Sequence, residues 1–321
     1  MDDRRSVLLL IDVEPDARKT SATADGWESS NLALDHLERL RGELESATGN
    51  TVRFNWFVRG DPQIAGTWGS ANYVAEACPR MLKAIERHGD YAASHVHLWR
   101  WSDTEGTWLN DFADRAWIEE CVETGLESFR SIFGYSAESF RFGDRWIDND
   151  AVALLRQHGI RYDLTVEPGL PGGGLHDDPH ARGTLPDFRT APREPWIPSP
   201  ADYLVPTTSG SDDMWMIPVT TTPPAWRLVR RAPWLVVGSR SPNLVLYPSL
   251  LWSHLQRELD RPSRAPLTLV FRSGDLGQSR FLRNFQRITR LLVRHPALPY
   301  CEFTSVADAM ARWRMTEGLA A

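Results

Sequence analysis

Four short segments of the chain carry acids, histidines or arginines directly after a run of apolar residues. The first run, Val7 to Ile11, is continuously apolar, which is typical of a strand buried on both faces, and Asp12 and Glu14 follow it. In an extended segment these two carboxylates point the same way. They repel each other unless a cation or a proton lies between them, so the pattern indicates a metal site or an acid/base pair. The alternative is a solvated acidic loop in which an aspartate caps the next turn.

The other three segments also place polar side chains at the ends of predicted strands. They contribute His95 and His97, then Arg141, Asp144 and Arg145, and finally Arg272 and Asp275. Because parallel strands bring such ends to one face of a sheet, we expect these residues to meet. Glu14 with His95 and His97 would make a mixed site that suits zinc or another divalent transition metal. Taken alone, each histidine is more often a hydrogen-bonded structural residue than a ligand.

The elements that must position these residues follow a strand, loop, helix order, which predicts parallel β/α units, closed or open. We predict a strand over 51–58, a Gly/Pro loop over 59–70, a helix over 71–88 and a long amphipathic helix over 111–130. The order breaks at about 167–241, which is rich in Pro and Gly and is expected to be an irregular insertion. With no internal repeat and no obvious linker, we expect one domain over 1–321.

Composition and charge exclude several classes of protein. The 321 residues are 42% hydrophobic and 24% charged, as in ordinary globular chains, and the net charge of −6 argues against nucleic-acid binding. The three cysteines are widely spaced and form neither a disulfide framework nor a CxxC motif, so a reducing cytoplasm is the simplest interpretation. No apolar run is long enough for a signal sequence or a membrane span. The oligomeric state is left open.

Tryptophan is abundant, with 14 residues, and several lie in polar, loop-like stretches near the predicted strand ends. Trp99, Trp101 and Trp146 could form flat aromatic walls on which a sugar ring stacks, with Asp144 and Arg145 beside them as substrate-binding residues. The alternative is that these rings are buried against the Gly/Pro insertion. The sequence favours neither interpretation.

In order, these motifs resemble those of the polysaccharide deacetylase superfamily, also called NodB-homology or carbohydrate esterase 4 proteins. The similar segments are Leu10-Ile11-Asp12-Val13-Glu14, then Ser94-His95-Val96-His97, and then Phe140-Arg141-Phe142-Gly143 followed by a helix and Gly159-Ile160-Arg161-Tyr162-Asp163. The resemblance extends over Ser6 to Thr165 and, more weakly, over Leu267 to Met310. It implies a distorted parallel (β/α) barrel and a divalent metal that helps to remove acetyl groups from amino sugars, and the mixed histidine and carboxylate donors favour zinc as that metal.

The resemblance also implies roles for individual residues. Asp12 would be the catalytic base, Glu14 and His95 would bind the metal, and Arg141 would orient the base through a charge-assisted hydrogen bond. The family's second histidine usually falls where this chain has Trp99, so His97 would take its place. Where the family has a late histidine as general acid, this chain has Arg272, which could stabilise an oxyanion.

Two functions remain open from the sequence. The first is a metal-dependent hydrolase that removes an acetyl group from an N-acetylated sugar or related amide. The second is a deacetylase-like domain that has lost catalysis and binds a glycan or a protein partner, which Trp99 and Arg272 would explain. Under either function we expect a saccharide or acetylated small molecule as the ligand.

Overall fold

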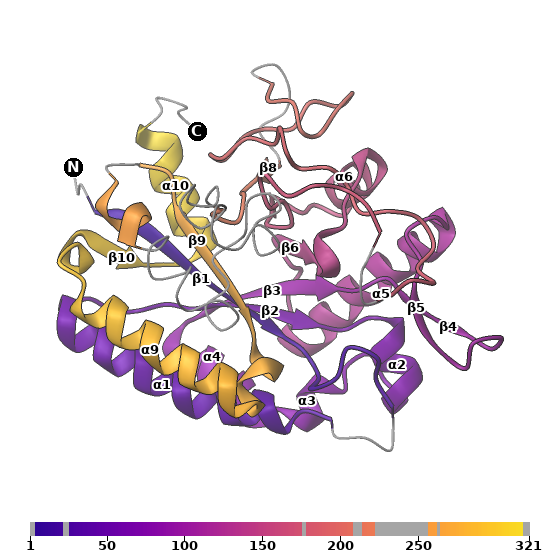
Figure 1. Ribbon diagram of the computed structural model, residues 1–321, viewed down its shortest axis with the longest axis horizontal. Coiled ribbons are helices and arrows are strands. Elements are labelled where there is room, and N and C mark those ends of the chain that lie inside the picture. The colour runs from indigo at the N-terminus through magenta and orange to yellow at the C-terminus, as the bar shows by residue number, and fades with distance from the viewer. Residues whose placement is uncertain are drawn as a thin grey trace, which may run out of the picture.

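The computed structural model describes residues 4–21, 26–174, 178–207, 214–221, 256–261 and 264–316. Its centre is an eight-stranded sheet in which every pairing is parallel (Figure 1). The strands are β1 (Arg5–Val13), β2 (Asn55–Arg59), β3 (Tyr91–Val96), β6 (Ser139–Phe142), β7 (Tyr162–Asp163), β8 (Trp215–Met216), β9 (Leu267–Arg272) and β10 (Cys301–Phe303). An antiparallel hairpin of β4 (Trp99–Ser102) and β5 (Thr107–Asn110) projects beside it.

The sheet curls into a distorted barrel, as the sequence predicted. Its order is β10-β1-β2-β3-β6-β7-β8, and β9 pairs with β1. Beyond β8, the backbone N–H of Thr220 donates to the carbonyl oxygen of Thr268 at 2.9 Å, and the N–H of Thr268 donates to Oγ1 of Thr220 at 2.8 Å. These two bonds join the chain after β8 to β9 and so connect the two sides of the sheet.

Helices cover the outer face of the barrel. They are α1 (Glu28–Thr48), α2 (Pro62–Trp68), α3 (Val74–Ala77), α4 (Pro79–His88), α5 (Arg115–Phe133), α6 (Asn149–Gln157) and α9 (Ser279–Arg294), while α10 (Val306–Thr316) packs on the other face of β1. Short 3-10 turns also occur, such as η1 (Gly143–Arg145) and η3 (Ser273–Gly277). α1 and α9 lie side by side, with α4 next to α1 (Figure 1). Among the described residues, no helix is both long and apolar enough to cross a membrane.

Alternate residues of β1 pack on opposite sides of the sheet, which defines the inside of the barrel. Leu9 and Ile11 belong to the large core cluster beneath the outer helices. Leu8 and Leu10 belong to a second cluster inside the barrel, which α10 helps to fill. All four side chains are fully buried, because β1 is covered on both faces.

Two local predictions are wrong. The predicted loop over 59–70 contains α2, because the Asp61 carboxylate accepts hydrogen bonds from the backbone N–H groups of Gln63 and Ile64, and Pro62 occupies the first helical turn. The predicted helix over 71–88 is broken into α3 and α4, because Pro79 has no N–H and starts a new helix. Of the expected insertion over 167–241, residues 175–177, 208–213 and 222–241 lie outside the described residues. The remainder contains only the two-residue strand β8 and isolated bridges.

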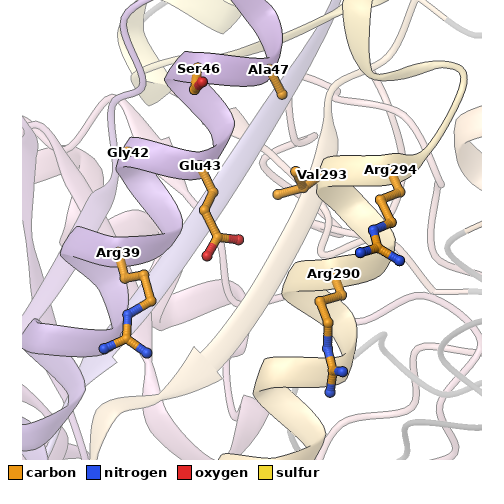
Figure 2. A pocket seen from close by; sticks show the side chains of 8 residues that line it. All are labelled: Arg39, Gly42, Glu43, Ser46, Ala47, Arg290, Val293 and Arg294. Carbon is orange, nitrogen blue, oxygen red and sulfur yellow. The ribbon is translucent and has the colours of Figure 1, made fainter.

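A groove of about 610 Å³ lies between α1 and α9 on the outer face (Figure 2). Three arginines, Arg39, Arg290 and Arg294, surround it together with Glu43, and Gly42 lies at its wall. None of these residues belongs to the strand-end set that the sequence singled out. The groove is therefore separate from the candidate site described next.

Candidate metal centre

The candidate site is built from residues that continue the inward-facing series of each strand. On β1, Asp12 and Glu14 follow the inward residues Leu8 and Leu10 at the period of two that a strand imposes. In the same way, His95 follows Ala93 on β3, and Arg272 follows Val270 on β9. Polar side chains from separate strands therefore converge at the C-terminal end of the barrel interior, as β/α folds require.

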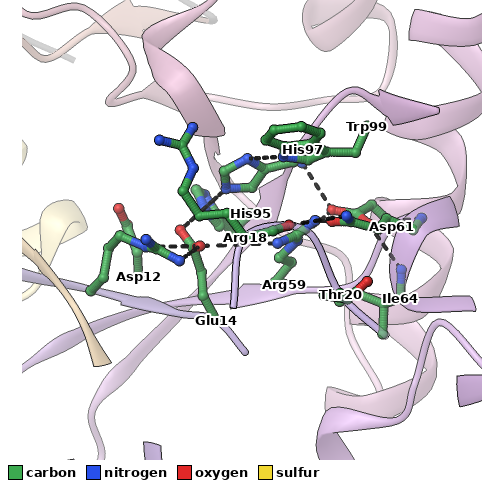
Figure 3. Close-up of polar contacts among 12 residues, drawn as sticks. Asp12, Glu14, Arg18, Thr20, Arg59, Asp61, Ile64, His95, His97 and Trp99 are labelled. Carbon is green, nitrogen blue, oxygen red and sulfur yellow. Dashed lines mark hydrogen bonds and ion pairs between the residues drawn. The ribbon is translucent and has the colours of Figure 1, made fainter. Parts of the chain in front are cut away.

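The side chains of Glu14, His95 and His97 converge on one point (Figure 3). Oε1 of Glu14 lies 3.1 Å from Nε2 of His95 and 3.2 Å from Nε2 of His97, and the two Nε2 atoms are 3.2 Å apart. In a tetrahedral zinc site with metal–ligand distances of about 2.0–2.1 Å, the ligand atoms are about 3.3–3.4 Å apart. The observed triangle is close to that size, so these three residues fit a divalent metal with a fourth position left open.

Hydrogen bonds to the other ring nitrogens fix how the imidazoles face this point. Nδ1 of His95 lies 2.9 Å from the carbonyl oxygen of Arg141, which can only accept, so this Nδ1 carries the proton and Nε2 carries a lone pair. Nδ1 of His97 lies 3.0 Å from Oδ2 of Asp144, whose carboxylate also accepts. Three electron-rich atoms then face one another, and a cation between them converts repulsion into coordination.

Charge and burial also favour the protonation states that metal ligands need. Burial lowers the pKa of His97 well below its ordinary value, and the charge on Arg59 lowers that pKa further, while Glu14 raises it. Burial raises the pKa of Glu14, but Arg272 and His97 lower it by more, so it ends well below its ordinary value. Near neutral pH, His97 is therefore neutral and Glu14 ionised, the forms that bind metals.

Arg141 binds one carboxylate oxygen of Asp12, and the other oxygen accepts no hydrogen bond from the described residues. Its Oδ2 accepts a hydrogen bond from Nε of Arg141 at 3.3 Å. Its Oδ1 is buried and has no hydrogen-bond partner among the described residues. Arg141 in turn donates to the Leu164 carbonyl oxygen and, at 3.3 Å, to Oε1 of Glu167. An unpaired buried acceptor costs about 1–3 kcal/mol, so Oδ1 is set to accept a proton or a hydrogen bond from a ligand.

Two guanidinium groups lie against the second oxygen of Glu14, Oε2. Nη2 of Arg272 is 2.6 Å and its Nε 2.9 Å from this atom, whereas Nη1 of Arg59 is 4.0 Å away. Arg59 is completely buried and is itself fixed by Asp61, whose Oδ2 lies 2.7 Å from Nε. The same Oδ2 accepts the backbone N–H of His97 at 2.9 Å. Asp61 therefore connects the end of β2, the start of α2 and the segment that carries both histidines (Figure 3).

Among the described residues, the ion pairs around Glu14 and Asp12 link six carboxyl groups with four guanidinium groups, an excess of two acidic side chains. The acids are Asp12, Glu14, Asp61, Asp144, Glu167 and Asp275, and the bases are Arg18, Arg59, Arg141 and Arg272. A divalent cation would balance this excess.

The three tryptophans singled out by the sequence have different surroundings. Trp99 and Trp146 are buried, whereas Trp101 is 49% exposed. Nε1 of Trp99 points at Nδ1 of His97, 3.1 Å away, and Trp146 stacks on Phe112 with ring centroids 5.8 Å apart. Of these three rings, Trp101 on the β4–β5 hairpin presents a face that a ligand can reach.

Asp144 and Arg145 follow β6 in η1, and both have a φ of 53°, which is uncommon for residues other than glycine. Among the three candidate ligands, Asp144 contacts His97 through its Oδ2 atom. Its other oxygen, Oδ1, pairs with Arg18 from the loop after β1. Nη1 of Arg145 is buried without a hydrogen-bond partner among the described residues. Whether either residue binds substrate stays a prediction.

Gly143 leaves the space that the His97 ring occupies. A Cβ atom added at Gly143 would lie 2.2 Å from Cε1 and Nε2 of His97, far inside van der Waals contact. Any larger residue here would therefore displace a candidate metal ligand.

Sequence reasoning did not single out Arg59, Asp61 or Arg18, and it gave Gly143 no role of its own. A signal for Arg59 was present, because it follows the inward residue Phe57 at the end of β2 in the same register as the other site residues. The Asp61-Pro62 pair is an ordinary helix-start signal. The contact of Gly143 with His97 joins two strand ends that are far apart in the sequence, and no local sequence pattern indicates it.

Comparisons with known proteins agree with this architecture. No protein-family model matches the sequence, and no curated protein is significantly similar to it. Among solved structures, the chain is similar to two proteins that carry the provisional name polysaccharide deacetylase. The one from Mycobacterium smegmatis has 15% identity and a TM-score of 0.53, and the one from Pseudomonas aeruginosa PAO1 has 13% identity and a TM-score of 0.55. It is also similar to an allantoinase, with 14% identity and a TM-score of 0.54. Each match covers 98% of this chain and 92% of the other. The chain therefore has the fold of the polysaccharide deacetylases, a distorted (β/α) barrel of the NodB type.

Proposed function

We propose that the chain is a metal-dependent hydrolase that removes an acetyl group from an N-acetylated sugar or a related amide. The observation that carries the proposal is the triangle of Glu14, His95 and His97, with the unpaired Oδ1 of Asp12 on the same inward face. Two nitrogen ligands and one carboxylate with an open fourth position are typical of catalytic zinc sites. The fold shared with polysaccharide deacetylases supports an amide of an amino sugar as the substrate class.

Each residue has a distinct part in this chemistry. Glu14, His95 and His97 would hold the cation, which when bound supplies Lewis acidity to the substrate carbonyl. Asp12 accepts the proton of the attacking water at Oδ1, while Arg141 fixes the other oxygen through a hydrogen bond from its Nε. Arg272 and Arg59 hold the outer oxygen of Glu14, so that Oε1 faces the two histidines. Arg272 also offers positive charge where an oxyanion develops.

A second candidate function, ligand binding without catalysis, is favoured by one observation. Arg272 is the residue that β9 delivers to the site, and its guanidinium is already engaged by Glu14 at 2.6 Å. Because an arginine stays protonated, it is a poor proton donor to a leaving amine. A binding domain of this fold would hold an acetylated saccharide without turning it over.

Acetate release separates the two functions. The purified chain is stripped with a chelator, reloaded with Zn²⁺, Co²⁺ or Mn²⁺, and incubated with N-acetylated saccharides. Allantoin is tested in a separate assay for hydrolytic ring opening, because it has no acetyl group to release and an allantoinase shares the fold. Hydrolysis needs the metal and is lost in Asp12→Asn, whereas Asp35→Asn, an exposed aspartate of α1 that pairs with Arg80, behaves as wild type. Saccharide binding without turnover by the loaded protein, unchanged in Asp12→Asn, would favour the binding domain instead.

A further inference from the structure

Nδ1 of His97 has two polar neighbours that require opposite protonation of the ring. Oδ2 of Asp144 lies 3.0 Å away and can only accept a hydrogen bond, whereas Nε1 of Trp99 lies 3.1 Å away and can only donate one. One nitrogen cannot satisfy both. If Nδ1 carries the proton, it donates to Asp144 and Nε2 keeps a lone pair. If Nδ1 is bare, it accepts from Trp99, and Nε2 carries the proton.

We propose that Asp144 and Trp99 compete for Nδ1 of His97, and that Asp144 is the positioning residue that holds the ring in the metal-binding tautomer. The inference rests on the proposed function, because it assigns His97 its role as a ligand. It gives Asp144 a task different from the contact with substrate that its place after β6 suggested.

The structure favours the bond to Asp144 on three grounds. A carboxylate is a stronger acceptor than a neutral ring nitrogen, so an N–H···O⁻ bond prevails over the bond from the indole. The Asp144 side chain is only 5% exposed, so an Nδ1–H donor replaces much of the water that its carboxylate has lost. Arg18 pairs with the other oxygen of Asp144, which holds this carboxylate in place.

The backbone around Asp144 is shaped to bring the carboxylate to His97. Asp144 has a φ of 53°, a left-handed conformation that aspartate tolerates better than most residues but that still costs free energy. The preceding Gly143 lies against the ring, where a Cβ atom would be 2.2 Å from Nε2. Arg18 comes from the loop after β1, which also carries Glu14. The contact of Asp144 with His97 therefore couples the ends of β1 and β6 to the segment after β3.

Trp99 is the competitor that must be kept from taking Nδ1. Its ring is 1% exposed and is packed in place, with Arg18 and Lys19 each 5.7 Å from its centroid. Since Trp99 cannot turn away easily, removing Asp144 leaves the indole N–H as the partner of Nδ1. His97 then places a proton, rather than a lone pair, toward Glu14 and His95.

This competition predicts opposite effects for the two neighbours. Asp144→Ala should weaken zinc binding about 10- to 100-fold, the usual effect of losing the outer partner of a ligating histidine. Asp144→Asn retains an acceptor oxygen and should weaken binding less. Trp99→Phe removes the competing donor and should leave zinc affinity equal or higher. In the double variant, Trp99→Phe should recover at least about threefold of the affinity lost in Asp144→Ala.

The test combines zinc affinity, measured by competition with a chromophoric chelator, and the histidine tautomer of the metal-free protein, read from long-range ¹H–¹⁵N spectra. The His97 signal is identified by its loss in His97→Gln. His95 is an internal reference, because the Arg141 carbonyl oxygen holds its tautomer. Asp148→Asn is the matched control, since Asp148 also pairs with an arginine, Arg115, and caps α6 outside the site.

We expect Asp144→Ala to convert His97 from the Nδ1–H to the Nε2–H form, with His95 unchanged. Zinc affinity within about twofold of wild type in Asp144→Ala, or an Nδ1–H signal that persists in that variant, would overturn the inference. If the wild type binds no zinc, the proposed function fails, and the spectra still decide the tautomer.

Discussion

A single added methyl group at Gly143 should abolish metal binding without a change in any polar atom. In Gly143→Ala, the new Cβ would lie 2.2 Å from Nε2 of His97, whereas ordinary contact begins at 3.4 Å, so the ring or the backbone must move by about 1.2 Å. Zinc–nitrogen distances vary by only about 0.2 Å in zinc sites, so a shift of this size would move His97 out of bonding distance of the metal. We expect zinc affinity to fall by at least about 100-fold, the upper end of what loss of an outer-shell partner causes. We also expect overpacking to lower the free energy of unfolding by about 1–3 kcal/mol.

Gly42 supplies the control for this experiment. It lies in the middle of α1 at the wall of the outer groove, and no atom lies within 4 Å of a Cβ added there (Figure 2). Gly42→Ala should raise the free energy of unfolding by about 0.5–1 kcal/mol through helix propensity and leave zinc binding unchanged. Both variants are measured by chelator competition and urea unfolding. Zinc affinity in Gly143→Ala within about threefold of wild type would refute the placement of His97 against Gly143.

Three further predictions concern single aspartates. Asp12→Asn should lower hydrolysis by about 10²- to 10⁴-fold in the acetate-release assay while zinc content stays unchanged, because the proposed function makes Asp12 a base and not a ligand. Asp90→Ala should lower the free energy of unfolding in urea by about 3–5 kcal/mol, because it leaves buried Arg41 without the carboxylate that it contacts at 2.6 and 3.0 Å. Burial raises the pKa of Asp163 to about 7, so the folded state holds a proton that the unfolded state loses near pH 4. The contribution of Asp163 to the free energy of unfolding is therefore greatest below about pH 4 and falls by about 4 kcal/mol at most as the pH rises to about 7. In urea unfolding across this range, the free energy of unfolding of Asp163→Asn should depend less on pH than that of the wild type.

Short apolar runs followed by polar residues predicted parallel β/α units, and the resemblance to polysaccharide deacetylases implied that they close into a distorted barrel. The run over Val7 to Ile11 is typical of a strand covered on both faces, and the structure buries all of it in β1. Strand period then places Asp12 and Glu14 on one side, and parallel pairing brings His95 and Arg141 to the same end of the sheet. These steps need only local pattern and the rules of parallel sheets.

The remainder of the site depends on contacts that a local pattern cannot encode. The bond between Asp144 and His97 joins residues 47 positions apart and depends on a left-handed backbone in η1. The sequence left open whether Trp99 is an exposed aromatic wall or a buried ring, and the structure buries it against His97. Asp61 was missed for a different reason: its helix-start signal was visible, but the Gly and Pro residues around it favoured a loop.

Metal stoichiometry tests the central claim most directly. The wild-type chain, loaded with Zn²⁺ and passed through a desalting column, should retain about one zinc per chain by elemental analysis. Glu14→Gln keeps the shape of the side chain but removes the charge between the two histidines, and it should retain almost none. A wild-type chain that retains no metal after loading, or a Glu14→Gln variant that retains a full equivalent, would contradict the assignment of Glu14, His95 and His97 as a metal centre.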